Sequence, residues 1–190
     1  MQRLLADVAS RRTPLVMHEV PCLTPRAVSV LPIRLLGDPV LRQPCAPVTR
    51  FDDPLRRVLR DLADTCRVPG RAGVAAPQIG VELRAFAYNV EGVEGYVVNP
   101  LIVHLEGEIE DLEGCLSIPR LSFPTRRAER AVVRGVDRLG RVIEIEGSGQ
   151  LARCLQHETD HLDGRLYIDR LDKDVRRRAL RIIRDRQIGR

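Results

Sequence analysis

The chain has 190 residues, of which 44% are hydrophobic and 30% are charged, and its formal net charge is +5. This length suits one domain with a sizeable core, and the composition is typical of globular proteins. No apolar run approaches the ~20 residues that cross a bilayer, so we expect no membrane span. Aromatic residues make up 3% of the chain, which is too few for a base-stacking surface, and we expect no DNA partner.

The cysteines stand at scattered positions, and none of them form a Cys-x-x-Cys pair: they are Cys22, Cys45, Cys66, Cys115 and Cys154. An odd number without paired spacing argues against a disulfide framework. Free thiols are typical of reducing compartments. We therefore predict a cytoplasmic protein.

The first thirty residues differ from the rest of the chain. Three prolines fall within residues 1–30, and no hydrophobic period is sustained there. We predict that this segment is a flexible N-terminal extension, or the product of a start codon placed too far upstream, and that a folded domain occupies residues 31–171.

Helical and strand patterns follow. Asp52, Asp53 and Pro54 are typical of a helix start. Apolar residues then recur at helical spacing from Leu55 to Ala63, and Pro69-Gly70 marks the end of the helix. Beyond it the sequence predicts short strands at residues 83–88, 96–98, 101–105, 131–136 and 142–145, with a turn at 137–140.

Residues 150–162 form the most informative predicted helix, which ends before Gly164. His157 and His161 lie four positions apart, so on a helix they share a face and can reach one metal ion. Glu158 follows the first histidine directly, where a carboxylate can move protons to and from an activated water. The pattern predicts a hydrolytic metal centre.

A catalytic metal site usually has three protein ligands. The two histidines supply two of them, so another residue must supply the third. Cys154 lies one helical turn before His157. The seven residues from Cys154 to His161 span about 10.5 Å of helix, however, which is too far for three short bonds to one ion. We therefore expect Cys154 to be a buried packing residue and the third ligand to come from another element.

The C-terminal segment, residues 172–190, carries the whole charge excess: eight basic and three acidic side chains. Val175, Ala179, Ile182 and Ile183 recur at helical spacing, which predicts an amphipathic basic helix. Such a helix could bind a polyanion such as RNA weakly and in a salt-dependent way. An equally good interpretation is a terminal helix with a solvated arginine face.

The order of these elements predicts an α+β fold. We expect small antiparallel sheets packed around a central metal-binding helix, with the basic helix at the C-terminus.

Three segments together resemble the peptide deformylase family. They are residues 73–78 (GVAAPQ), residues 113–117 (EGCLS) and residues 156–164 (QHETDHLDG), and they occur in the family's order. The similarity runs from about residue 32 to residue 172, and the resemblance implies that residues 31–171 are the catalytic domain.

The resemblance also implies the roles of particular residues. Cys115, His157 and His161 would bind one divalent ion, with Fe²⁺ favoured over Zn²⁺ or another metal, and Glu158 would transfer protons. The Gln78 side-chain amide and the Leu116 backbone N–H would stabilise an oxyanion. Gly73, Val74 and Gly114 would contact the substrate, and Glu113 would hold its loop.

The implied substrates are nascent polypeptides that begin with N-formylmethionine, and the products are formate and a free amino terminus. In related enzymes a basic C-terminal extension contacts the ribosome, so the resemblance implies a weak ribosome contact through residues 172–190.

One position departs from the family pattern. Arg71 stands where the first glycine of the loop signature falls, and arginine tolerates positive φ poorly. We expect Gly70 to take the turn one residue earlier and Arg71 to affect substrate preference.

Two other functions stay open at this stage. A zinc peptidase shares the His-Glu-x-x-His pattern, although it would leave residues 113–117 without a role. A basic, metal-stabilised ribosome-binding module without activity would need only the metal site and the tail.

Overall fold

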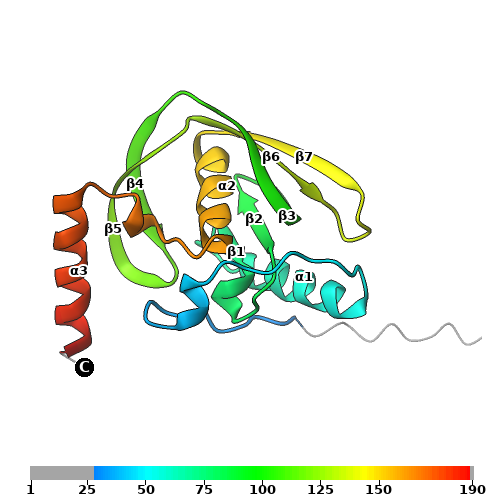
Figure 1. The fold of residues 1–190 in the computed structure, drawn as a ribbon, viewed down its shortest axis with the longest axis horizontal. Helices are drawn as coiled ribbons and strands as arrows, with labels where there is room; N and C mark the ends of the chain where they lie inside the picture. The colour runs from blue at the N-terminus through cyan, green and yellow to red at the C-terminus, as the bar shows by residue number, and fades with distance from the viewer. Residues whose placement is uncertain (1–27, 189–190) are drawn as a thin grey trace, which may run out of the picture.

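The computed structural model describes residues 28–188, so nearly all of the predicted extension, residues 1–30, lies outside the described range. Figure 1 shows the fold. In the element names below, η marks a 3-10 helix. In chain order the elements are η1 (Pro39–Arg42), α1 (Asp53–Cys66), β1 (Gly73–Ala75), η2 (Ala76–Ile79), β2 (Ala85–Val90), β3 (Val93–Glu106), β4 (Ile109–Cys115), β5 (Ile118–Arg127), β6 (Arg130–Val136), β7 (Val142–Ser148), α2 (Gly149–Leu162), η3 (Tyr167–Asp169) and α3 (Lys173–Ile188).

Two antiparallel sheets surround α2. One contains five strands in the order β1-β2-β3-β6-β7, and the other is the β4–β5 hairpin. Figure 1 shows α2 between the hairpin and the larger sheet. Leu155 and Leu162 of α2 are fully buried against Phe86 and Val97 of that sheet. The predicted α+β architecture around a central helix is confirmed.

Helix α1 begins and packs as its sequence predicts. The Asp52 carboxylate accepts a hydrogen bond from the Leu55 N–H, which satisfies a free donor of the first turn. Leu55, Leu59 and Leu62 are buried and pack against β1 and β2. The helix ends at Cys66, three residues before Pro69.

Helix α2 ends by a specific hydrogen-bond pattern. The Gly164 N–H bonds the His161 carbonyl at 3.1 Å, and the Arg165 N–H bonds the Asp160 carbonyl at 2.9 Å. Gly164 has φ +71°, the left-handed conformation that this C-terminal cap requires. The observed bounds agree with the predicted helix at residues 150–162.

The strands differ from their prediction in two ways. Residues 96–98 and 101–105 belong to one long strand, β3, because Asn99 (φ +50°) forms an irregularity in the ladder without ending it. Strands β1, β4 and β5 were not predicted. The buried positions of β5 alternate through Phe123, Thr125 and Arg127, so polar inward residues hide the usual apolar alternation.

Helix α3 covers the outer side of the β4–β5 hairpin (Figure 1). Ala179 is fully buried in a cluster that also contains Cys115, Ile118 and Tyr167. The predicted apolar face of the tail therefore packs on the domain and is not free. Among the described residues, no helix combines the length and apolarity that a bilayer crossing needs.

Candidate metal centre

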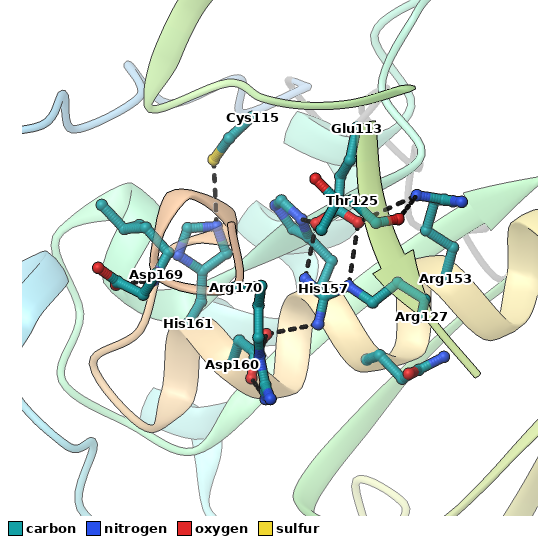
Figure 2. Close-up of polar contacts among 12 residues, drawn as sticks. Glu113, Cys115, Thr125, Arg127, Arg153, His157, Asp160, His161, Asp169 and Arg170 are labelled. Atoms are coloured by element: carbon teal, nitrogen blue, oxygen red, sulfur yellow. Dashed lines mark hydrogen bonds and ion pairs between the residues drawn. The ribbon is translucent and has the colours of Figure 1, made fainter. Parts of the chain in front are cut away.

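Three side chains predicted as ligands lie together. Cys115 is the last residue of β4, and His157 and His161 come from adjacent turns of α2. Their Sγ and ring nitrogen donors all lie within 4.8 Å of one another, and Cys115 Sγ is 3.3 Å from His161 Nε2 (Figure 2).

The donor set fits a divalent ion. Bonds of about 2.0–2.3 Å in a tetrahedral arrangement place neighbouring donors roughly 3.3–3.8 Å apart, and the 3.3 Å between Cys115 Sγ and His161 Nε2 fits this spacing. Burial opposes ionisation of the Cys115 thiol, but the charge on His161 and hydrogen bonds with both imidazoles hold its pKa well below the ordinary value. A thiolate is the form that binds metals.

Glu113 fixes the orientation of His157. Its Oε1 lies 2.7 Å from His157 Nδ1, so a neutral imidazole donates from Nδ1 and leaves Nε2 for an ion. Besides its place in the loop, Glu113 therefore bonds a predicted metal ligand.

A buried chain of ion pairs continues from Glu113. Arg127 donates to both Glu113 oxygens, at 3.0 and 2.6 Å, and to Asp160 at 2.6 Å. Arg153 approaches Glu113 from the other side at 3.3 Å, and Arg170 binds Asp160 (Figure 2). Burial opposes ionisation of Glu113, but hydrogen bonds from Arg127 and His157 outweigh it and lower the pKa to about 2.

Glu158 has the opposite environment. It is 3% exposed, and its Oε2 has no hydrogen-bond partner among the described residues. Burial raises its pKa to about 7, although the charges of His157 and His161 act against this. Gly73 permits this placement, because a Cβ added there would lie 2.4 Å from Glu158 Oε1.

A cleft of about 590 Å³ gives access to these residues, a volume typical of ligand sites. Gln78, Leu116, Gly73 and Gly114 line it. Val74 is instead fully buried in the core between α1 and β1.

The orientation of Gln78 is fixed by its neighbours. Its Oε1 accepts a hydrogen bond from the Ala75 N–H at 2.9 Å. Its Nε2 therefore faces Ser117 Oγ at 3.3 Å and Cys115 Sγ at 3.7 Å, which directs an N–H donor towards the metal ligands.

Comparison with known proteins decides the family. The family model for polypeptide deformylase matches residues 30–177. A peptide deformylase from Acidothermus cellulolyticus is 54% identical over 158 residues, covering 83% of this chain and 88% of the relative. The chain belongs to the polypeptide deformylase family.

Solved structures agree with this assignment. Peptide deformylase from Thermus thermophilus has a TM-score of 0.78 at 41% identity, covering 84% of this chain and 96% of that one. The enzyme from Acinetobacter baumannii, solved with bound Met-Ala-Ser, has a TM-score of 0.72 at 28% identity, covering 76% and 100%.

The loop that departs from the family pattern turns as expected. Gly70 has φ +85°, whereas the φ of Arg71 is not positive. The turn is thus made one residue earlier, and Arg71 lines the cleft.

Cys154 is a buried packing residue, as predicted, and the other described cysteines that were not predicted as ligands lie outside the ligand cluster, as does His104. Cys154 is buried, its Sγ donates to the Ala72 carbonyl at 3.3 Å, and it lies outside the ligand cluster. Cys45 and Cys66 are buried free thiols, and His104 is exposed. Cys22 and His18 lie outside the described residues.

Sequence reasoning missed the arginines and Asp160 that support the ligands. The signal for Arg127 was the alternation of β5, which places it on the same inward face as Phe123 and Thr125. Asp160 lies within the predicted metal motif, one residue before His161. A buried carboxylate at that position needs a positively charged partner.

The buried Glu113 should make stability fall in acid. Its pKa is depressed from 4.5 to about 2, so its contribution is complete above about pH 4.5 and is lost as the pH falls towards 2. We expect Glu113→Gln to lower the free energy of unfolding at neutral pH by about 3 kcal/mol and to flatten this acid dependence. Urea unfolding between neutral pH and pH 3 measures both effects.

Glu94→Gln is the matched control, because Glu94 forms a two-point ion pair with Arg67 at the surface. A solvated pair contributes little to stability. Equal losses from the two substitutions would contradict the role given to Glu113.

Proposed function

We propose that this chain is a metal-dependent hydrolase that removes the N-formyl group from the formylmethionine of nascent polypeptides and releases formate. One observation carries this conclusion: in a chain of the deformylase family, Cys115, His157 and His161 lie together, and Cys115, His157 and Glu158 line a cleft. The zinc peptidase and the inactive binding module are not favoured, because the family's name describes deformylation.

We propose Cys115, His157 and His161 as the ligands of one divalent ion. Two imidazoles and a thiolate suit Fe²⁺ and Zn²⁺ alike. The family resemblance favours Fe²⁺, with Zn²⁺ or another divalent ion as alternatives. When bound, the ion supplies Lewis acidity, which polarises the formyl group and activates water near neutral pH.

Glu158 is the proposed proton carrier. A carboxyl group with a pKa of about 7 exchanges protons readily at neutral pH. It accepts a proton from the attacking water and donates it to the departing amine nitrogen as the carbon–nitrogen bond breaks. The products are formate and a free amino terminus.

Gln78 and Leu116 are the proposed donors to the oxyanion. The bond from the Ala75 N–H to Gln78 Oε1 directs the Nε2–H groups towards Ser117 and Cys115, and the one that faces Cys115 would turn to the oxyanion. Fixed donors of this kind stabilise negative charge without reorganisation. Leu116 directly follows Cys115, so its backbone N–H is close to the same place.

The peptide itself is proposed to contact Gly73, Val74 and Gly114. Because the side chain of Val74 is buried, only its backbone is available. The Acinetobacter relative holds Met-Ala-Ser, a peptide that begins with methionine, which supports the same substrate class here.

We further propose three parts of the chain: an extension at 1–30, a catalytic domain at 31–171 and a basic helix at 172–190. The exposed arginines of α3 would make a weak contact with ribosomal RNA. The free cysteines support the prediction of a cytoplasmic location.

Glu158→Gln tests the proton transfer. We expect a fall in kcat of about a hundredfold or more with unchanged metal content, because Glu158 is not a ligand. Anaerobic formate release from formyl-Met-Ala-Ser gives the rate, and elemental analysis gives the metal content. Full activity of the variant would reject this role, and cleavage of the Met–Ala bond by the wild type would favour the peptidase.

Gly73→Ala tests the close contact with Glu158. The added methyl group would lie 2.4 Å from Glu158 Oε1, so the carboxylate must move. A displacement of about 1 Å lowers the rate by roughly a hundredfold, and we expect that loss with the metal retained. Gly114→Ala, also in the cleft, is the comparison: its added Cβ would lie no closer than 3.6 Å to another residue, so it leaves Glu158 in place and should lower the rate less.

Ribosome association is best tested without deleting α3, because Ala179 packs against the cluster that contains Cys115. Replacing the exposed Arg177, Arg178 and Arg181 with glutamine should weaken ribosome pelleting. It should also reduce the slope of log K against log salt by up to about two units. The same changes at the exposed Arg57, Arg60 and Arg138 serve as control, and equal losses in both triples would reject the contact.

A further inference from the structure

The acidic residues that line the cleft are buried, whereas two of its arginines reach solvent. Both acids, Glu113 and Glu158, are only 4% and 3% exposed and lie beside the metal ligands. Arg153 is also buried and is paired with Glu113. The lining charges that reach solvent are Arg71, which is half-buried, and Arg120, which is exposed. The solvent side of the cleft is therefore positive.

Arg71 is held in place by the end of α1. Its Nη1 donates to the Thr65 carbonyl at 2.8 Å, and Thr65 lies in the last turn of α1. The carbonyl end of a helix favours a cation. This contact uses one of the five guanidinium donors, and Arg71 has no ion-pair partner within residues 28–188.

Arg120 is held at a cost in backbone conformation. Its φ is +59°, a left-handed value that is unfavourable for residues with a Cβ and that glycine adopts freely. The Arg186 side chain of α3 donates to its carbonyl at 3.0 Å, which helps to fix this turn. In the described part of the chain no carboxylate pairs with its side chain. An arginine kept at a strained, exposed position of a cleft points to a functional role.

The two arginines approach the cleft from different segments. Arg71 precedes β1, and Arg120 lies near the start of β5. If the formyl group lies at the metal ligands, as the proposed function requires, the peptide must leave the cleft towards solvent. An extended chain advances about 3.3 Å per residue, so the residues just after formylmethionine pass this rim.

We propose that Arg71 and Arg120 form a cationic rim that selects formylated peptides with acidic side chains in the first residues after formylmethionine. This inference rests on the proposed deformylase function and adds a preference by charge. A partly solvated ion pair changes an equilibrium by about two- to fivefold, and salt screens it.

The test compares values of kcat/KM for three peptides with amidated C-termini, so that no terminal carboxylate interferes. They are formyl-Met-Glu-Glu-amide, formyl-Met-Ala-Ala-amide and formyl-Met-Lys-Lys-amide, assayed by formate release with the metal-loaded enzyme. We expect the Glu-Glu peptide to exceed the Lys-Lys peptide by about tenfold at low salt, and the ratio to shrink in high salt.

Variants identify the residues that are responsible. Arg71→Gln and Arg120→Gly should each reduce the Glu-to-Lys ratio by about two- to fivefold, and Arg71→Glu should reverse the preference. Arg120→Gly also relieves the positive φ, so a folding defect does not obscure the result. Arg57→Gln, on the exposed face of α1, should leave the ratio unchanged.

The outcomes separate the two proposals. A wild-type enzyme that deformylates all three peptides equally overturns the cationic rim and leaves the deformylase function intact. The same holds if a preference exists but survives both rim substitutions. A wild-type enzyme that releases no formate even from the Ala-Ala peptide overturns the function and the rim together.

Discussion

Pairing of buried charges is the constraint on which the metal centre depends. Gln156 to His161 are six consecutive polar residues of α2, and each is less than 10% exposed. A buried ion costs several kcal/mol unless an opposite charge and hydrogen bonds compensate it. The hairpin β4–β5 meets this need, because Arg127 joins Glu113 to Asp160. The helix and the hairpin are thus held together by the charges that also orient His157, a proposed metal ligand.

The two buried carboxylates show how environment divides their roles. Glu113 faces Arg127 and Arg153, and its pKa falls to about 2. Glu158 has no arginine partner in the described range, and burial raises its pKa to about 7. A permanently ionised group is suited to orienting His157, whereas a group that titrates near neutrality is suited to moving protons. The two environments therefore fit the different roles proposed for Glu113 and Glu158.

The sequence predicted the helices and strands that have a clear apolar period or clear capping residues at their ends. Asp52 to Pro54 marked the start of α1, and Gly164 marked the end of α2, because caps depend on local geometry. Strands β4 and β5 were missed because their buried residues include Glu113, Thr125 and Arg127, residue types that are usually exposed. A local sequence pattern cannot show that polar residues are buried, because the residues that bond them in the folded protein lie far away along the chain.

The same limit applies within the site. Spacing alone placed His157, Glu158 and His161 on one helix, and the family resemblance supplied Cys115. Neither could show that Arg127 and Arg170 hold Asp160, because these arginines come from separate segments and no spacing rule links them.

The C-terminal helix shows why charge and packing must be considered together. Its charge suggested either an RNA contact or a solvated arginine face, and the structure adds that Ala179 is buried with Cys115 and Tyr167 and that Arg186 bonds the Arg120 carbonyl. One face of α3 therefore supports the turn that follows Cys115, while the other presents arginines to solvent. Because a single helix does both, removing it would alter the metal site as well as any contact with RNA. Only changes confined to the exposed face can separate the two effects.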